Sequence, residues 1–200
     1  MFFKQTSLHK RDFYERTKMD LIGLTDEDLM KKVAAHDAEA FQVLVNRYSQ
    51  KVYACAWRLV SNKTDAEDMT QEVFFKVWRH AEKWSPDAKL STWLYRILYN
   101  HYIDMCRRRK PMENEIPETA SSEPSPEQRL LKEAEEREVA DAINSLPARQ
   151  REALILCYHQ GLKAKDAADI LSVSVGALES LLFRARQTLK DRLLERKETA

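Results

Sequence analysis

Glycine is scarce in this chain. Only three of the 200 residues are glycine, at positions 23, 161 and 176. Phosphate-binding loops and the sharp turn that presents a catalytic serine both need glycines at fixed spacing. The motifs GxxxxGK[ST], GxGxxG and HExxH do not occur. These absences argue against an enzyme, and we expect no cofactor and no small-molecule substrate.

The chain has few cysteines and no long apolar run. Cys55, Cys106 and Cys157 are scattered and form no CxxC pair, which indicates a reducing compartment and no zinc site. No apolar run approaches the length of a membrane span, and the first residues lack the pattern of a signal peptide. We therefore expect a cytoplasmic protein without membrane insertion or bound metal.

Charge of one sign is not in excess either. Lys and Arg number 33 against 32 for Asp and Glu, which leaves a net charge of +1. Any contact with nucleic acid must therefore come from local basic patches. Hydrophobic residues make up 44% of the chain, enough to form a core.

Helical periodicity dominates the rest of the sequence, and no segment alternates long enough to predict a sheet. Capping sequences at Thr25 and Thr64 predict two helix starts, and Ser91 or Thr92 can cap a third. Gly161 is expected to end the helix that begins near Ala148. The other helices are expected from Asp37 through Leu59, from Ser125 to about Ser145, and over Ala164–Leu171 and Ala177–Leu194.

A change of composition divides the chain. Residues 111–126 hold four of the six prolines and four glutamates, which is typical of a flexible acidic linker. We therefore predict an N-terminal extension over 1–24, a helical domain over 25–110, the linker, and a second helical domain over 127–195.

The helix expected from Thr64 to about His80 has two unlike sides. Ala66, Met69, Val73 and Val77 form the predicted buried side, with Phe74 at its edge. Phe75 stands on the opposite side, among polar and charged residues. Either this is a solvated face with one stray apolar residue, or it is a protein-binding face with an aromatic anchor. The exposed residues are expected to be Asp68, Gln71, Glu72, Phe75 and Arg79.

The last expected helix also has a polar side. It follows a short helix and a tight connection, which is the order of a helix-turn-helix. Its polar side is either a solvated surface or a recognition surface for the DNA major groove, and the preceding helix and turn favour recognition. The predicted buried stripe contains Leu178, Leu181, Leu182, Ala185 and Leu189, and the exposed side contains Glu179, Ser180, Phe183, Arg184 and Gln187.

Aromatic and basic residues alternate between Trp84 and Lys110. Such a segment suits unstacked bases and phosphates, but aromatics at helical spacing also form ordinary core. Trp93 and Leu94 are expected in the core. The basic run at 107–110 can serve DNA or simply complement the helix dipole.

Four motifs, in order, resemble the extracytoplasmic-function (ECF) sigma factors of bacterial RNA polymerase. Residues 65–79 (DAEDMTQEVFFKVWR) resemble the family's region 2.2, and residues 91–109 resemble regions 2.3–2.4. Residues 145–152 (SLPARQRE) resemble the start of region 4, and residues 175–186 (VGALESLLFRAR) resemble its recognition helix.

The resemblance implies an all-α protein with two small domains, a region 2 bundle and a region 4 helix-turn-helix, joined by the linker. It implies a non-enzymatic partner of core RNA polymerase and promoter DNA, and we expect an anti-sigma factor as an inhibitor. Carried over by position, core-polymerase binding falls to Asp68, Gln71, Glu72 and Phe75. Contacts with −10 DNA fall to Trp84, Asn100, His101, Asp104, Arg107 and Arg108, and contacts with −35 DNA fall to Glu179, Ser180, Phe183, Arg184 and Arg186.

The sequence departs from the family pattern in the second domain. Ala167 replaces a larger aliphatic residue, Ala177-Leu178 replaces the more usual Thr-Val and removes a hydroxyl that could cap the helix, and Leu181 replaces a frequently basic residue. A self-sufficient helix-turn-helix regulator, with residues 25–110 for sensing or dimerisation, remains the alternative reading.

Overall fold

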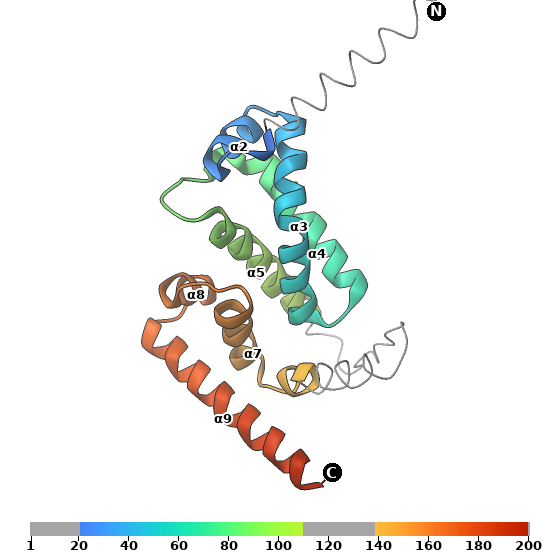
Figure 1. The fold of residues 1–200 in the computed structure, drawn as a ribbon, viewed down its shortest axis with the longest axis vertical. Helices are drawn as coiled ribbons and strands as arrows, with labels where there is room; N and C mark the ends of the chain where they lie inside the picture. The colour runs from blue at the N-terminus through green and yellow to red at the C-terminus, as the bar shows by residue number, and fades with distance from the viewer. Residues whose placement is uncertain (1–20, 110–138, 200) are drawn as a thin grey trace, which may run out of the picture. The chain divides into compact units, whose positions relative to one another are not determined.

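The computed structural model describes residues 21–109 and 139–199. Within these ranges the chain is helical and contains no strand (Figure 1). The expected linker and almost all of the expected N-terminal extension lie outside the described residues, as does the helix start at Ser125. The elements are α2 (Asp26–Ala34), α3 (Ala38–Val60), α4 (Lys63–His80), η1 (Ala81–Lys83), α5 (Leu90–Arg109), α7 (Ala148–Leu154), η2 (Ile155–His159), α8 (Ala164–Leu171) and α9 (Val175–Thr199).

The described residues form two compact units. The first comprises residues 21–52 and 70–98, and the second comprises residues 53–69, 99–109 and 139–199. These units divide α3, α4 and α5, whereas the domains expected from the sequence, 25–110 and 127–195, keep each helix whole. The domain boundaries stay a prediction.

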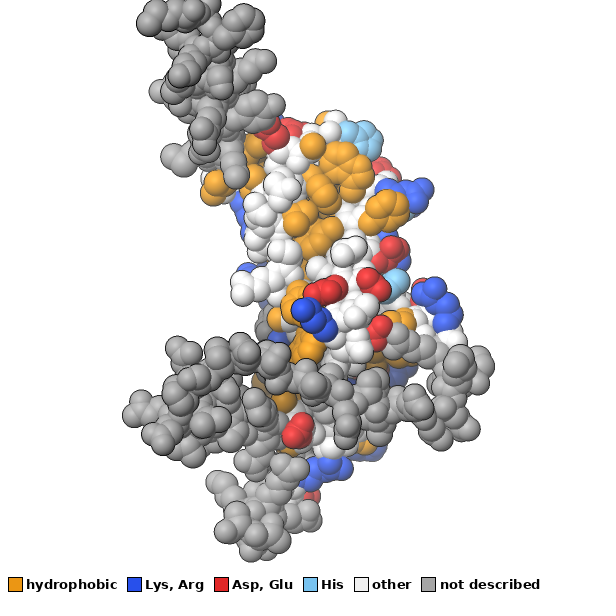
Figure 2. All heavy atoms as spheres, turned by 90° about the vertical axis from the view of Figure 1, so that its right-hand side faces the viewer, with side chains coloured by type: hydrophobic (Ala, Val, Ile, Leu, Met, Phe, Trp, Pro, Cys, Tyr) orange, Lys and Arg blue, Asp and Glu red, His pale blue; other side chains and the backbone are white. Residues whose placement is uncertain are grey.

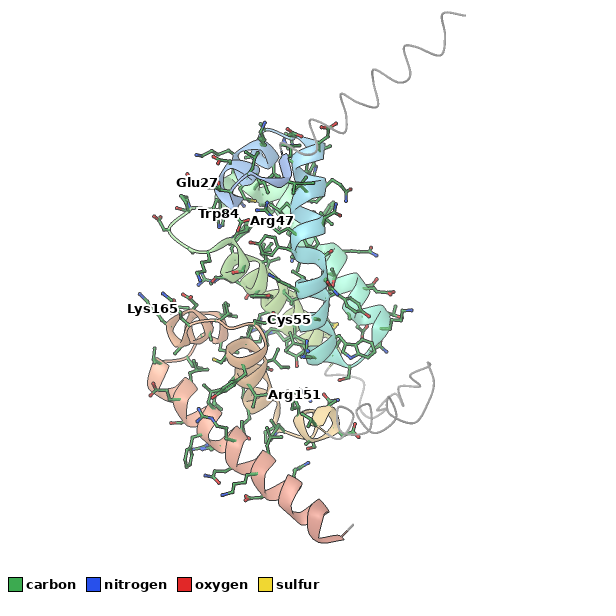
Figure 3. All side chains as sticks on the ribbon, viewed as in Figure 1. Glu27, Arg47, Cys55, Trp84, Arg151 and Lys165 are labelled. Atoms are coloured by element: carbon green, nitrogen blue, oxygen red, sulfur yellow. The ribbon has the colours of Figure 1, made fainter. Side chains whose placement is uncertain are left out.

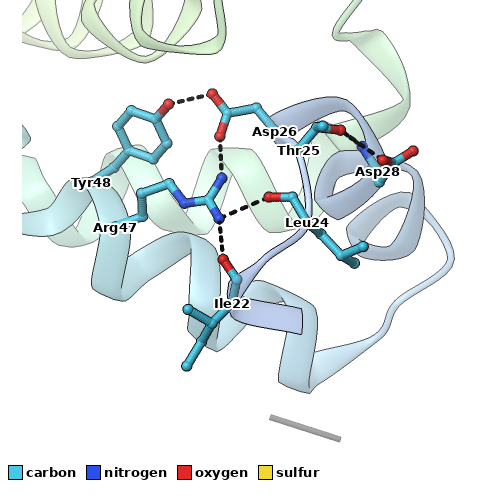
Figure 4. Close-up of polar contacts among 7 residues, drawn as sticks. All are labelled: Ile22, Leu24, Thr25, Asp26, Asp28, Arg47 and Tyr48. Atoms are coloured by element: carbon cyan, nitrogen blue, oxygen red, sulfur yellow. Dashed lines mark hydrogen bonds and ion pairs between the residues drawn. The ribbon is translucent and has the colours of Figure 1, made fainter. Parts of the chain in front are cut away.

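A polar network fastens α2 to α3 in the first unit (Figure 4). Thr25 caps α2 by accepting the amide of Asp28 at 3.1 Å, as the capping sequence predicted. The Arg47 guanidinium lies 2.6 Å from the Asp26 carboxylate and donates to the carbonyl oxygens of Ile22 at 3.0 Å and Leu24 at 2.9 Å. The Asp26 carboxylate also accepts the Tyr48 hydroxyl. One arginine therefore holds both the start of α2 and the backbone before it.

The start of α4 differs from the prediction. Thr64 lies inside the helix, and the cap is Asn62, whose side-chain oxygen accepts the amide of Asp65 at 3.1 Å. Both residues can cap, but Ser61 adopts a positive φ of 51°, which ends α3 and leaves Asn62 at the turn. The cap therefore lies two residues earlier than predicted, and the helix begins at Lys63.

The start of α5 also lies upstream of the prediction. The helix begins at Leu90, and the amide of Trp93 donates to the carbonyl of Lys89 at 3.3 Å. Ser91 and Thr92 consequently stand in the first turn instead of capping it. Leu90 and Thr92 are both buried, so packing of this turn decides the start.

The helix-turn-helix lies in the second unit. Leu146, Leu154 and Ala185 form a buried cluster, against which Ile143 and Leu189 pack. α8 spans Ala164–Leu171, the range expected from the sequence. α9 starts two residues earlier than expected, because Ser174 caps it by accepting the amide of Ala177 at 3.2 Å. The hydroxyl that Ala177 lacks is thus supplied three residues upstream.

The helix that begins at Ala148 changes its winding before it ends. After Leu154 it becomes the π-helical turn η2, in which the amide of Gln160 donates to the carbonyl of Ile155 at 3.3 Å. Gly161 then terminates it with a φ of +62°, as predicted. The change from α to π winding was not expected from the sequence.

Candidate functional site

α4 presents an acidic surface with an aromatic residue in it. Asp68, Gln71 and Phe75 are exposed, Glu72 is half-buried, and Phe75 keeps 53% of its surface exposed. These residues follow one another at the three- and four-residue spacing that places side chains on one side of a helix. The opposite side is buried at Ala66, Met69, Val73, Phe74 and Val77, which confirms the predicted buried side. The predicted exposed side is confirmed except at Glu72, which is half-buried.

Neighbouring charges flank the exposed ring. The Arg79 guanidinium lies 5.3 Å from the centroid of the Phe75 ring, within the range of a cation–π contact. Lys76 lies 3.5 Å from a Glu72 carboxylate oxygen. Figure 2 shows the side of the molecule that bears α4, where hydrophobic side chains stand among acidic and basic ones. A large exposed aromatic in such a setting is typical of a protein-binding anchor.

α5 presents polar and basic side chains along its second half. Asn100, Asp104, Arg107 and Arg108 are exposed, and His101 is half-buried. Asp104 restrains both arginines: its carboxylate lies 3.8 Å from Arg107, and its carbonyl accepts the Arg108 Nε at 3.3 Å. The arginines therefore stand along one exposed stretch of helix, where they are available to phosphates.

The tyrosines of the same helix have a different role. Tyr95, Tyr99 and Tyr102 are buried, so they are core residues and not a stacking surface for bases. Leu94 is fully buried as expected, whereas Trp93 is only half-buried. Of the two interpretations of this aromatic segment, core packing is correct for the tyrosines.

Trp84 lies at the start of the loop that leads from η1 to α5 (Figure 3). Its side chain is half-buried, and its Nε1 is buried without a hydrogen-bond partner among the described residues. A buried indole N–H usually finds an acceptor. This donor is therefore buried and unsatisfied among the described residues.

The recognition surface expected on α9 is exposed. Glu179, Ser180, Phe183, Arg184 and Arg186 all face solvent, and Phe183 keeps 60% of its surface exposed. Ser180 donates to the Gly176 carbonyl at 2.9 Å. Leu178, Leu182 and Ala185 are buried, while Leu181 and Leu189 are half-buried. The short helix α8 and the left-handed Ser172 (φ 55°) precede α9, which completes a helix-turn-helix.

One contact of this surface had no signal in the sequence. The Arg186 guanidinium lies 5.6 Å from the centroid of the Tyr158 ring, and Tyr158 keeps 57% of its surface exposed. Tyr158 belongs to η2, 28 positions before Arg186. Helical periodicity relates only residues within one helix, so it could not pair these two.

The cysteines differ in their surroundings. Cys55 is buried in α3, and this burial raises the pKa of its thiol to about 12 (Figure 3). Cys157 is half-buried, and desolvation raises its pKa as well. Cys106 is also half-buried. Over the described residues, no three His, Cys, Asp or Glu side chains gather into a possible metal site.

Comparisons with known proteins identify the family of this chain. Sigma-70 region 2 matches residues 44–111, and Sigma-70 region 4 matches residues 136–189. The ECF RNA polymerase sigma-E factor of Haemophilus influenzae is 35% identical over 182 residues, covering 85% of this chain and 96% of the relative. The chain belongs to the ECF sigma factors.

Further relatives and solved structures agree with this family. The RNA polymerase sigma-H factor of Pseudomonas aeruginosa is 32% identical over 180 residues, which is 82% of this sigma factor and 91% of the relative. The sigma factor RpoE of Bartonella quintana, solved in complex with the anti-sigma factor NepR, aligns with a TM-score of 0.64 and 28% identity over 76% of this chain and 96% of that chain. A structure of CnrH with the cytosolic domain of CnrY aligns with a TM-score of 0.63 and 27% identity, over 84% and 96%.

Family membership settles the class of activity. A sigma factor is a non-enzymatic transcription initiation factor, so the interpretation as an enzyme is excluded. The self-sufficient regulator is not favoured, because both sigma regions match in one chain. In the part of this sigma factor that the structure describes, no helix is long and apolar enough to cross a membrane.

Proposed function

We propose that this sigma factor binds core RNA polymerase, directs it to promoters with −35 and −10 elements of its own, and assists the opening of the DNA. One observation carries the proposal: in a chain that matches both sigma regions, the expected polymerase and −35 residues stand on exposed sides of α4 and α9. In this proposal residues 25–110 act as the region 2 domain, 111–126 as the linker and 127–195 as the region 4 domain.

The polymerase-binding surface is Asp68, Gln71, Glu72 and Phe75. The carboxylates and the amide offer hydrogen bonds and charge, and burying the exposed Phe75 ring contributes apolar area. The expected site on the polymerase is the coiled coil of the clamp in its largest subunit. The surrounding charges would set orientation and association rate more than affinity.

The −10 surface is the segment from Trp84 to Arg108. We propose that Asn100 helps to hold one extruded −10 base and that Trp84 also contacts the −10 DNA. Extrusion costs a few kcal/mol of stacking, which a stacking partner in the pocket helps to offset. His101, Asp104, Arg107 and Arg108 would lie along the adjoining DNA.

The −35 surface is the exposed side of α9. In a helix-turn-helix, residues near the start of the recognition helix contact base edges and later basic residues contact phosphates. Glu179, Ser180, Phe183 and Arg184 occupy the first turns of α9, and we assign them to the bases. Arg186 follows and is assigned to the backbone.

We further propose a cytoplasmic site of action and an anti-sigma factor as partner. RpoE of Bartonella quintana was solved with such an inhibitor. In this sigma factor the exposed rings of Phe75 and Phe183 are the apolar features that an inhibitor would cover. Pull-downs from the native cell under several growth conditions should recover an inhibitory protein besides polymerase. Recovery of polymerase alone, under all conditions, would contradict this.

The central test is binding to core RNA polymerase, followed by run-off transcription from a promoter pool. Tight binding with new start sites is the expected result. The double variant Gln71→Ala, Glu72→Lys should weaken polymerase binding without loss of helicity. Glu27→Lys on α2 is the matched control, since it reverses an exposed charge away from the proposed surface. Equal affinity of the double variant and the control would refute the assigned surface.

The same assay separates base contacts from phosphate contacts. Arg184→Ala should cost about 1–3 kcal/mol of promoter discrimination if Arg184 contacts a base. Equal loss on all promoters would make it a phosphate contact. Failure to bind core polymerase, together with specific binding of the free protein to duplex DNA, would favour the self-sufficient regulator.

A further inference from the structure

The exposed ring of Tyr158 is unusual for an aromatic residue of a helix-turn-helix core helix. Ile155 and Leu156, in the same π-helical turn, are fully buried and pack this turn into the core. Tyr158 instead keeps 57% of its surface exposed and faces the Arg186 guanidinium at 5.6 Å. The Tyr158 ring therefore lies at the surface, where it contacts Arg186 of α9, and contributes little to the core.

The π-helical turn explains how Tyr158 reaches this place. Inserting a π turn shifts every later side chain around the helix axis, and such turns are frequent at functional sites. Gly161, with its positive φ, then ends the helix only three residues after Tyr158. α9 packs against α7, and η2 continues directly from α7.

Arg186 stands at the edge of the recognition surface. It follows Phe183 by three residues and Glu179 by seven, so the three side chains share one side of α9. It lies about three turns into the helix, beyond the first residues, which contact base edges. Its expected target is therefore a backbone phosphate.

A guanidinium that stacks with its face on an aromatic ring leaves its N–H edges free. Without such a ring, a long arginine side chain loses considerable rotamer freedom when it binds a phosphate. A ring that already confines the guanidinium reduces that loss, which is the general advantage of a preorganised contact.

We propose that Tyr158 is a positioning residue for promoter binding: its ring holds the Arg186 guanidinium so that its N–H edges meet a phosphodiester of the −35 duplex. The proposal rests on the proposed sigma function and adds to it a residue outside the recognition helix. It commits to a phosphate contact, so the effect of Tyr158 should be independent of promoter sequence.

The test uses the full chain bound to core RNA polymerase and a fluorescent duplex carrying the −35 and −10 elements found in the transcription experiment. Affinity is measured at several salt concentrations for Tyr158→Leu, Tyr158→Phe, Arg186→Met and the double variant Tyr158→Leu, Arg186→Met. Tyr158→Gln is a second ring-free variant, in case the leucine variant loses helicity.

Tyr158→Leu should weaken binding about two- to fivefold, the factor that corresponds to an exposed cation–π contact. Arg186→Met should weaken it at least as much and lower the slope of log affinity against log salt by about 0.9. Tyr158→Phe should bind like the unchanged protein, because the ring face is retained. In the Arg186→Met background, Tyr158→Leu should have no further effect.

Several outcomes would overturn the proposal. Tyr158→Leu and Tyr158→Gln with unchanged affinity and salt slope would show that the ring does nothing for DNA binding. Fully additive effects of the two substitutions would show that Tyr158 acts independently of Arg186. A loss confined to one −35 sequence would indicate base recognition. If the unchanged protein gave no promoter-specific transcription with core polymerase, the proposed function itself would fail, which is a separate result.

Discussion

Replacing Arg47 by methionine tests how the first turn of α2 is held in this sigma factor. The substitution removes the ion pair with Asp26 at 2.6 Å and the hydrogen bonds to the carbonyls of Ile22 and Leu24. Methionine keeps much of the aliphatic length, so the packing of the stem is largely retained. The effect should therefore come from the lost polar contacts.

The expected size follows from the exposure of the pair. The side chains of Arg47 and Asp26 are 29% and 32% exposed, between a surface pair and a buried one. Exposed pairs contribute about 0–1 kcal/mol, and breaking a buried pair costs about 3–5 kcal/mol. Asp26 keeps its hydrogen bond from Tyr48, and the freed carbonyls can regain water. We therefore expect a loss of about 2 kcal/mol in the free energy of unfolding.

Urea unfolding followed by tryptophan fluorescence measures this loss locally. All four tryptophans lie between residues 57 and 93, so the signal reports on the region 2 part of the chain. With a slope of about 2 kcal/mol per molar urea, the midpoint should fall by about 1 M. Arg47→Lys should recover part of the loss, since lysine keeps the charge without the planar fork.

Lys76→Met is the matched control. Lys76 makes an i,i+4 ion pair with Glu72 at 3.5 Å within α4, and such a helix pair contributes less than about 0.5 kcal/mol, whereas Arg47 also donates to two backbone carbonyls. If Arg47→Met shifts the midpoint no more than Lys76→Met, the network is not what holds α2, and the reasoning is refuted.

The remaining predictions concern backbone conformation and thiols. Gly161→Ala should lower the free energy of unfolding by about 1 kcal/mol, because alanine is strained at a φ of +62°. Gly176→Ala, within the α9 helix, should be neutral or stabilising. Circular dichroism melts compare the two variants, and equal shifts of the melting temperature would contradict the argument. Cys106 should react with a disulfide reagent at pH 8 in the folded protein. Cys55 should not react, because Cys55 is buried and its pKa is raised to about 12. Fast labelling of all three cysteines would refute this prediction. Since the folded pKa of Cys55 lies above its ordinary value of 9.0, the free energy of unfolding should fall as the pH rises from about 9 toward 12, and Cys55→Ala should remove that part of the dependence.

Local pattern was enough for the helices and their faces. The buried side of α4 recurs every three or four residues, and burial of one stripe per helix is a local consequence of amphipathic spacing. α8 kept its expected bounds, Ala164–Leu171, and Gly161 ended its helix as expected. The family motifs are also linear strings, so membership in the ECF sigma factors could be inferred before the fold.

Helix starts were less accessible to sequence reasoning. Several residues that can cap stand within one turn of each other, and their local preferences are similar. Asn62 caps α4 in place of Thr64, and Ser174 caps α9 ahead of Ala177. α5 begins at the buried Leu90, so Thr92 lies inside its first turn. The choice among neighbouring caps depends on which side chains the rest of the molecule buries.

Contacts between separate elements depended on the folded chain. Arg47 and Asp26 lie 21 positions apart, and Tyr158 and Arg186 lie 28 apart, so no helical period relates either pair. The π-helical turn that exposes Tyr158 also leaves no periodic trace in the residues. Amphipathic spacing determines which side of a helix faces inward, but only packing of one helix on another determines which side chains meet.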